Sequence, residues 1–225
     1  MMKALILALL MVASPVWAQD DMASWDTTRV GEARGEVSTY ARKVDGSPVK
    51  AFKGEVELKA SMTSVLAVIT AVDTFPEWIF QNQSAERLTS DHKERILMAF
   101  NGIWPVSDRD VVLANTLSQD DASKTITLHS VNAEGFADKR DGFVRIPALD
   151  NQFTLTPLDD GWVRVKFETF VDPGGSVPVW LANLVATRAP YETLEGIKVQ
   201  LQKPRFANAT RDDLPNLPGM DQLEL

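Results

Sequence analysis

Residues 172–183 read Asp-Pro-Gly-Gly-Ser-Val-Pro-Val-Trp-Leu-Ala-Asn, and they separate two regular patterns in the sequence. Before them, Trp162–Phe170 alternates between apolar and polar residues, which is typical of a strand with one buried face. Pro173 and the two glycines stop that strand, because proline lacks a backbone N–H and glycine allows a positive φ. Ser176 can accept hydrogen bonds from the first N–H groups of a helix, and Pro178 suits an early helical position. The sequence therefore predicts a strand that turns directly into a long helix.

The predicted helix runs from about Val177 to Leu201. Its apolar residues recur at steps of three and four, which places them along one face. About 25 residues at 1.5 Å each make a rod of roughly 37 Å. Pro190 lies inside this stretch, and we expect it to kink the helix or to split it into two pieces. A helix of that length needs a sheet on which to bury its apolar face.

The chain before this helix consists mostly of strand patterns. Val49–Ala60 alternates between apolar and charged residues, which predicts a half-buried strand. Ser61 then caps a short helix with an apolar face. Residues 19–34 are expected to be irregular or to form a short helix around Trp25. Further strands are predicted at Val37–Arg42, Arg95–Trp104, Asp110–Leu117, Lys124–Val131 and Trp162–Phe170. Gly142–Ile146 and Gln152–Thr156 are expected to form two short strands or one bent strand.

The later strands follow one another at a spacing of roughly eight to twelve residues, which is typical of a meandering antiparallel sheet. The order of strands, helix, many strands and long helix predicts the α+β class, with helices on one face of the sheet. A strongly curved sheet around the last helix leaves a space between the two. Function depends on whether side chains or a ligand fill that space.

The N-terminus has the features of a secretory signal peptide. Lys3 is followed by an apolar run, Ala4–Ala13, and then by a short segment that ends at Ala18. The apolar run is well short of the ~20 residues needed to span a bilayer, which disfavours a membrane anchor. We therefore expect residues 1–18 to be removed and the mature protein to be periplasmic or secreted.

Composition restricts the partners and cofactors. The formal net charge is −8 at pH 7, which disfavours nucleic acid and gives no long-range attraction to anionic membranes. The lack of cysteine excludes disulfides, thiolate metal sites and a lipid-modified N-terminal cysteine. The two histidines, His92 and His129, do not match a metal-binding spacing. We therefore expect no cofactor and no metal.

Four motifs resemble the START (steroidogenic-acute-regulatory-related lipid-transfer) family of the helix-grip superfamily. In order along the chain they are Phe75–Trp78, Trp104–Asp110, Gly142–Pro147 and Asp172–Asn183. The resemblance covers roughly residues 25–203 and implies a helix-grip fold, in which a curved antiparallel β-sheet wraps around a long C-terminal α-helix. It predicts a START-like lipid-binding domain at residues 19–206. Residues 207–225 are then expected to form an extended, loosely held C-terminal tail.

The resemblance also implies a function. In this family the fold encloses a tunnel that shields one lipid or sterol from water, and the C-terminal helix acts as a lid. The implied function is non-enzymatic binding and transfer of a single hydrophobic molecule, such as a phospholipid, a fatty acid or a sterol-like compound. The implied partners are that molecule and, transiently, a membrane. Some sterol-binding members carry a tunnel arginine where this chain has Asn115, and this departure disfavours a sterol.

The residues expected to line the tunnel are mostly apolar, as in most ligand pockets. Simple core packing is the alternative role of each apolar side chain. Asn115 and Thr169 are candidates for hydrogen bonds to a head group, although each can also bond to backbone or face solvent. Arg188 lies either at the edge of the apolar surface or at the tunnel mouth. The candidate ligand-binding residues are Phe100, Trp104, Val112, Ala114, Asn115, Phe153, Leu155, Val165, Phe167, Thr169, Trp180, Leu184, Val185 and Arg188.

Other roles have weaker support in the sequence. Arg109 and Asp110 are expected to form an ion pair or to brace a loop. No catalytic residue is expected, because motifs for a nucleophile, a Walker loop or a dinucleotide are absent. The superfamily also includes cyclases and aromatases, so an enzyme with His129 and a nearby carboxylate as acid and base is an alternative. A second alternative is an envelope lipid sensor that signals through the tail.

Overall fold

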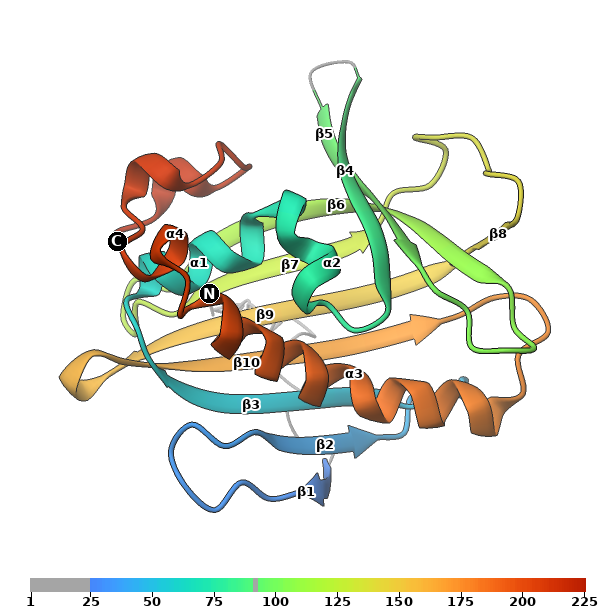
Figure 1. Ribbon diagram of the computed structural model, residues 1–225, viewed down its shortest axis with the longest axis horizontal. Coiled ribbons are helices and arrows are strands. Elements are labelled where there is room, and N and C mark those ends of the chain that lie inside the picture. The colour runs from blue at the N-terminus through green and yellow to red at the C-terminus, as the bar shows by residue number, and fades with distance from the viewer. Residues whose placement is uncertain (1–24, 91–92) are drawn as a thin grey trace, which may run out of the picture.

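Ten strands form one sheet in the computed structural model, which describes residues 25–90 and 93–225 (Figure 1). The order across the sheet is β1-β2-β3-β10-β9-β7-β6-β5-β4, and β8 pairs in parallel with β6. The strands are β1 (Asp26–Arg29), β2 (Ser38–Arg42), β3 (Ala51–Lys59), β4 (Asn82–Ser90), β5 (Lys93–Phe100), β6 (Asp108–Gln119), β7 (Ile126–Asn132), β8 (Phe143–Arg145), β9 (Ala148–Leu158) and β10 (Trp162–Asp172). The α-helices are α1 (Met62–Thr70), α2 (Phe75–Trp78), α3 (Val179–Gln200) and α4 (Pro204–Ala207).

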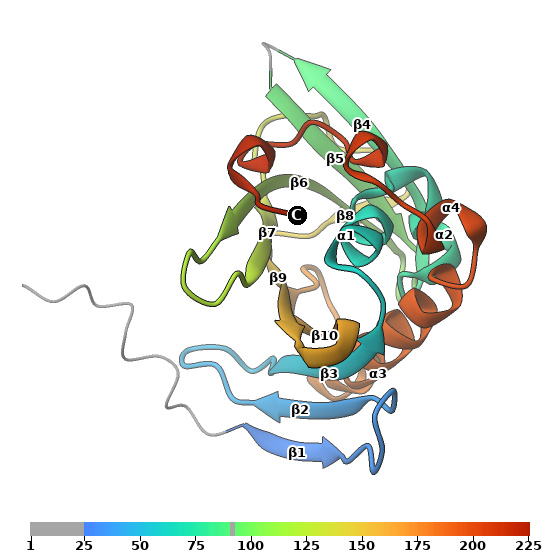
Figure 2. The same cartoon turned by 90° about the vertical axis from the view of Figure 1, so that its left-hand side faces the viewer.

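The sheet is strongly curved. Viewed end on in Figure 2, its strands surround α1, while α2, α3 and α4 lie along the open side. Val65 and Leu66 of α1 are fully buried in the same cluster as Leu155 and Val165 of the sheet. This arrangement confirms the predicted α+β class and the predicted curved sheet around a long C-terminal helix.

α3 packs closely against β3 because Gly54 leaves room for it. A Cβ atom at Gly54 would lie 2.7 Å from Leu194 Cδ1 and 3.0 Å from Pro190 Cβ. Gly196 has a similar role toward α2, since its Cβ atom would lie 2.6 Å from the carbonyl oxygen of Trp78. The two glycines fix the second half of α3 between β3 and α2.

α3 differs from its prediction in two details. It begins at Val179 without a side-chain cap, so the predicted cap by Ser176 is wrong. The Val177 N–H bonds to the Gly175 carbonyl, which places Ser176 inside a tight turn before the helix. Of the two outcomes expected at Pro190, a split of the helix is wrong, because α3 continues through Pro190 to its end (Figure 1). Pro190 packs on Gly54 of β3.

Residues 26–29 form the edge strand β1 rather than the irregular segment or short helix expected there. The strand pairs with β2, so that Thr27 lies opposite Tyr40. Trp25, just before the strand, lies under the cationic groups of Arg42 and Lys53, at 4.9 Å and 4.7 Å from the ring centroid. Pairing with β2 decides this structure, and the composition of residues 26–29 alone does not reveal it.

The C-terminal tail is part of the core, so the expectation of an extended and loosely held segment is wrong. Residues beyond 206 contain two short 3₁₀ turns, Arg211–Asp213 and Met220–Gln222. Leu217, Met220 and Leu223 are buried in the main hydrophobic cluster. The Leu117 N–H of β6 donates to the Pro218 carbonyl at 3.0 Å, which joins the tail to the sheet. Residue 206 therefore does not mark the end of the packed domain.

The predicted signal peptide, residues 1–18, lies outside the described residues. Within residues 25–90 and 93–225, every helix is too short or too polar to cross a bilayer.

Candidate ligand-binding site

A cavity of about 240 Å³ lies between α3 and the concave face of the sheet. One enclosed water needs roughly 10–15 Å³ of such space, so the cavity is far larger than a packing defect. Its walls come from β3, β5, β6, β7, β9, β10, α1, α2 and α3. Residues from the loops at 101–106 and 173–177 complete the end beside the start of α3.

A second hollow of about 470 Å³ lies between α1, β4 and the tail. Its lining includes Asp73 and Arg205, which form an ion pair with each other. Because these charges are already partnered, the hollow offers less to a ligand than the apolar cavity under α3. We therefore take the cavity under α3 as the candidate site.

Aromatic side chains form one wall of the cavity. Phe153 of β9 and Phe167 of β10 are directly opposite each other in the sheet, and their rings stack with centroids 4.4 Å apart. Trp78 of α2 meets Phe153 edge-on at 6.3 Å, and Phe75 meets Trp78 at 5.4 Å. These contacts hold the rings in fixed positions, so the wall is rigid and apolar.

A row of polar residues crosses the cavity floor next to this aromatic wall. Asn115, Ser130, Asn151 and Thr169 are successive register partners on β6, β7, β9 and β10, and all four line the cavity. Thr169 Oγ1 donates to Asn151 Oδ1 at 2.7 Å. Asn115 Oδ1 is buried and has no hydrogen-bond donor among the described residues. The row therefore offers polar contacts inside an otherwise apolar space.

Arg109 lines the end of the cavity beside the segment that precedes α3. Only 8% of its surface is exposed. Its Nη1 donates to the Ser107 carbonyl, while its Nε has no acceptor among the described residues. Burial lowers the pKa of the Arg109 guanidinium, and Asp108 acts in the opposite direction. Arginine nevertheless stays protonated in proteins, so Arg109 is a buried cation.

Asp110 pairs with Arg145 of β8 and not with Arg109. Arg145 Nε lies 2.8 Å from Asp110 Oδ1, and Nη2 lies 3.1 Å from Oδ2. Arg145 also donates to the carbonyls of Ala137 and Asp138, which braces the loop before β8. Consecutive strand residues point to opposite faces, so Asp110 serves the loop while Arg109 faces the cavity.

The cavity brings together only part of the predicted set. On β6 the prediction mixes two faces of the strand: Leu113 and Asn115 line the cavity, whereas Val112 and Ala114 do not. Leu155 and Val165 lie on the expected face of their strands. They pair with each other beyond the end of the cavity, where they pack in the solid core with α1. The predicted residues that line the cavity are Phe100, Asn115, Phe153, Phe167, Thr169 and Val185.

The helix candidates are divided between two faces of α3. Leu181 and Val185 line the cavity. Trp180 and Leu184 are 68% and 56% exposed, because they lie one residue earlier and therefore about 100° around the helix. Their prediction as lining residues is wrong for this structure.

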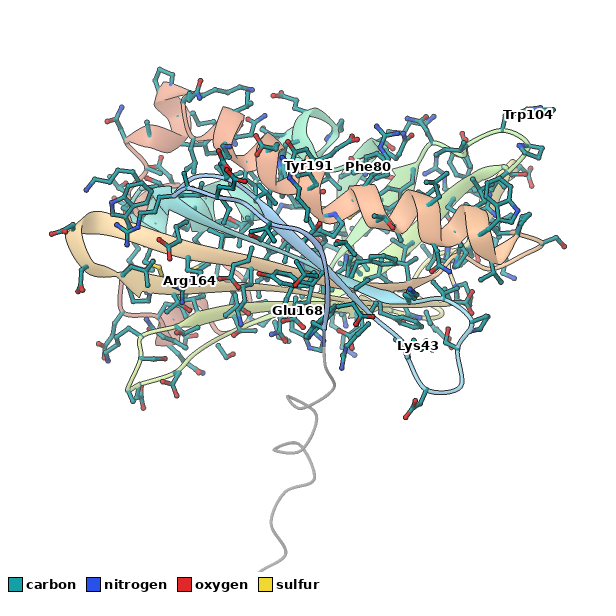
Figure 3. All side chains as sticks on the ribbon, turned by 90° about the horizontal axis from the view of Figure 1, so that it is seen from below. Lys43, Phe80, Trp104, Arg164, Glu168 and Tyr191 are labelled. Atoms are coloured by element: carbon teal, nitrogen blue, oxygen red, sulfur yellow. The ribbon has the colours of Figure 1, made fainter. Side chains whose placement is uncertain are left out.

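Arg188 and Trp104 also lie outside the cavity. Arg188 Nε lies 2.8 Å from Glu192 Oε1, and its guanidinium lies over the Phe80 ring, so it stays at the outer edge of the apolar surface. β5 ends at Phe100, and the following loop carries Trp104 outward, where it is 88% exposed. Figure 3 shows Trp104 at the end of the molecule where α3 begins.

Sequence reasoning missed Ser130, Asn151 and Arg109 as lining residues. Ser130 lies two residues from Leu128, and Asn151 lies two residues from Phe153, so both share a face with an apolar lining residue. That spacing is the signal in the sequence for a polar residue on an inward face. The inward face of Arg109 follows in the same way from Leu113 and Asn115 on β6.

The predicted acid–base pair exists but lies away from the cavity. His129 Nε2 is 2.8 Å from Asp150 Oδ1, and their side chains are 41% and 61% exposed. Ser130 lines the cavity, so the preceding His129 faces the other side of β7. His92 lies outside the described residues. Within the described part of the chain, no group of three His, Cys, Asp or Glu residues is placed to hold a metal ion.

Comparisons with known proteins agree with this geometry. No family model matches the chain. The chain is 32% identical to a STAR-related lipid transfer protein from Xanthomonas axonopodis, whose crystal structure aligns with a TM-score of 0.71 over 80% of this chain and 99% of that one. The human StarD13 lipid transfer and protein localization domain has the same fold, with 23% identity and a TM-score of 0.65 over 84% of this chain and 93% of that one.

Sequence relatives point the same way. An uncharacterized protein of Pseudomonas aeruginosa is 27% identical over 88% of this chain and 98% of its own length. Mouse StAR-related lipid transfer protein 13 is 28% identical over 62% of this chain, which spans only 12% of that longer protein. The curved sheet and its long C-terminal helix are the helix-grip fold. This chain belongs to the StAR-related lipid-transfer (START) family, as its motifs predict.

Proposed function

We propose that this protein binds one hydrophobic or amphipathic molecule in the cavity under α3 and carries it without bond-making chemistry. The observation that carries the proposal is the cavity itself, which combines an aromatic wall with a few polar residues, four of them in a row across the sheet. A mostly apolar pocket with a few placed polar groups is typical of small-molecule sites. The names of the START relatives, which describe lipid transfer, support the same class of ligand.

The first half of α3 is suited to act as a lid. Its second half is anchored by buried Leu194 and Ile197, whereas Leu181 is the buried residue among positions 179–189. In the described part of the chain, one hydrogen bond joins the first half to the segment before β3, from the Lys50 N–H to Asn183 Oδ1 at 3.0 Å. A segment with few buried contacts opens at lower free energy than the rest of the fold. We therefore expect α3 to move at its first half when the ligand enters or leaves.

Exposed apolar side chains near this lid suggest a transient membrane contact. Trp104, Trp180 and Leu184 are all strongly exposed. Ile103 and Leu181, their neighbours in sequence, line the cavity, so the exposed side chains lie close to it. Tryptophan favours the boundary between water and lipid, because its ring is apolar and its N–H is polar. This surface would bring the lid to the membrane from which a lipid is taken.

The enzyme alternative has a specific observation against it. The His129–Asp150 pair is exposed to solvent and faces away from the cavity. A general base must reach the proton that it removes, and a substrate in the cavity lies on the other side of the sheet. Replacing His129 with Ala should leave ligand uptake unchanged.

Native mass spectrometry of the gently purified protein tests the proposal. Ala186→Trp fills the cavity from α3, and Thr187→Trp places the same ring on the exposed side of the next position. We expect a co-purified apolar molecule on the wild type and on Thr187→Trp, and its loss from Ala186→Trp. A wild type that is free of ligand and that also takes up no fluorescent lipid would contradict the proposal.

A further inference from the structure

The charged groups that line the cavity all have the same sign. Among its described lining residues, Lys50 and Arg109 are cationic, and none is Asp or Glu. The chain as a whole has 31 acidic and 23 basic residues, so this lining is opposite to the charge balance of the molecule. Charges interact more strongly in an apolar space than in water. The cavity is therefore electrostatically complementary to an anion.

Arg109 has free donors for such an anion. A guanidinium presents five N–H donors in a fixed fork. The structure gives one of them an acceptor within the described residues, the Ser107 carbonyl. Asp108 lies nearby in sequence, but its Oδ1 accepts from the Gly102 N–H at 2.8 Å. Arg145 makes a contrast, since it is also largely buried but forms a two-pronged pair with Asp110.

Burial without a hydrogen-bonded carboxylate is costly for a cation, because the charge loses its water and the nearby Asp108 offsets only part of that loss. If Arg109 were only structural, its role would be the single hydrogen bond to the Ser107 carbonyl. A lysine or a neutral donor could make that bond as well. Arg42, Arg95 and Arg164 also have an Nε with no hydrogen-bond acceptor among the described residues. Of these four arginines, only Arg109 lines the cavity, where a ligand can reach it.

Arg109 lies at the far end of the cavity, and Lys50 lies nearer to the polar row. The Lys50 backbone is bonded to Asn183 near the start of α3, and Arg109 Nη2 lies 4.0 Å from the Cβ position of Gly175 in the preceding turn. Asn115, in the polar row, is six residues further along β6, or about 20 Å away at 3.3 Å per residue. Leu113 and Val171 line the cavity between Arg109 and the polar row, and the aromatic wall lies beyond that row. The cavity therefore changes along its length from a cationic end to polar and apolar walls.

We propose that the molecule carried in this cavity is an amphiphile with one anionic group, a carboxylate or a phosphate, which Arg109 binds. This inference rests on the proposed carrier function and specifies its ligand class. The planar fork of arginine matches two oxygens of either group, and such charge-assisted pairs are stronger than neutral hydrogen bonds. Lys50 adds a second positive charge to the cavity lining.

Three lipids with the same oleoyl-length chain test this inference: oleate, oleoyl lysophosphatidic acid and the neutral oleyl alcohol. Binding is measured by calorimetry, below the concentrations at which each lipid forms micelles. We expect the wild type to bind at least one anionic lipid about tenfold or more tighter than oleyl alcohol. Arg109→Met should remove that preference and keep the affinity for oleyl alcohol within about twofold, whereas Arg109→Lys should keep part of it. Arg188→Met, which removes an exposed arginine outside the cavity, should behave as the wild type.

Each result has a separate meaning. A wild type that binds oleyl alcohol as tightly as both anions overturns the inference but leaves the carrier function intact, and this comparison needs no variant. An equal loss of all three affinities in folded Arg109→Met assigns Arg109 to positioning of the Ser107 loop and also overturns it. Failure of the folded wild type to bind any of the three lipids contradicts the carrier function as well. A preference for oleate or for lysophosphatidic acid supports the inference and identifies the anionic group.

Discussion

Asp110 and Arg145 form a two-pronged ion pair across the parallel strands β6 and β8, with 1% and 17% of their side chains exposed. The pair connects the central sheet to the loop before β8, because Arg145 also bonds to two loop carbonyls. Arg145→Met would leave a buried carboxylate without its counter-charge. We expect a loss of about 3–5 kcal/mol in the free energy of unfolding, measured by urea denaturation.

Two variants separate this effect from general damage. The double variant Asp110→Asn with Arg145→Met should be more stable than Arg145→Met alone, since no unpaired charge remains. Arg188→Met breaks an exposed pair with Glu192 and should cost only about 0.5 kcal/mol or less. An Arg145→Met protein as stable as Arg188→Met would refute this account of the pair.

Gly54 sets the distance between β3 and α3. In Gly54→Ala the new Cβ would lie 2.7 Å from Leu194 Cδ1, so the helix or the strand has to shift. We expect a loss of about 1–3 kcal/mol, typical of overpacking, together with weaker ligand binding, because α3 covers the cavity. Denaturation and lipid binding are measured side by side. Glu55→Ala changes the next residue on the opposite face and should alter neither by much, since its pair with Arg164 is partly exposed.

Leu223 ties the C-terminus to the core. Its side chain is 4% exposed, whereas Leu225, two residues later, is 42% exposed. Leu223→Ala should therefore destabilise the protein by about 2 kcal/mol or more, and Leu225→Ala by less than about 0.5 kcal/mol. Thermal unfolding of the two variants checks the prediction. Equal melting temperatures would mean that the tail is not packed as described.

Asp73 links the segment after α1 to α4 through Arg205. A hydrogen bond from Arg205 holds the pKa of the Asp73 carboxyl below its ordinary value, although burial opposes this shift. A lowered folded-state pKa adds stability above the unfolded-state pKa of about 3.9, and this stability is lost as the pH falls through the folded-state pKa. We expect Asp73→Asn to flatten the dependence of stability on pH below about pH 4.

Urea denaturation between about pH 2.5 and pH 6 measures this dependence. Because Asp73 and Arg205 are 63% and 57% exposed, solvent weakens the pair and the effect should be small. Asp159→Asn, in the exposed turn before β10, is the control and should keep the wild-type slope. A variant slope that matches the wild type would exclude Asp73 as a contributor.

Trp104 tests the proposed membrane contact. Trp104→Ser should reduce binding to lipid vesicles several-fold, because it removes the most exposed aromatic ring beside the cavity. It should not change the affinity for a lipid monomer, since Trp104 does not line the cavity. Trp162→Ser is the matched control, because Trp162 begins β10 and contacts Arg34 and Lys59. Equal vesicle binding by both variants would argue against the contact.

Elements with strong periodicity could be predicted from the sequence. β3 and β10 were predicted from their alternating residues, and α3 from its three- and four-residue steps. The predicted bounds lie within about two residues of the observed ones at each end. β1 could not be predicted, because its polar residues form a strand only through pairing with β2, and the packed tail depends on partners far away in the chain. Leu117 and Pro218, for example, are joined by a backbone bond that no local pattern indicates.

The candidate site was harder to predict, because the lining depends on which face of each element turns inward and where the cavity ends. Val112 and Asn115 cannot both face the cavity on one regular strand, yet each is plausible by residue type. Leu155 has the correct face and still lies in the solid core. Arg109 could not be assigned, since its partner in the sequence, Asp110, is bound to Arg145 in the structure.

Val56 of β3 pairs with Val165 of β10 in the sheet. These two strands are far apart in the sequence, so the ribosome synthesises β10 long after β3. A chain synthesised from its N-terminus cannot complete this sheet until β10 has appeared. Pairing over such a separation slows folding, and sheets of this kind close in milliseconds to seconds rather than microseconds. The first strands of the nascent protein therefore stay without their β10 partner until most of the domain has been made.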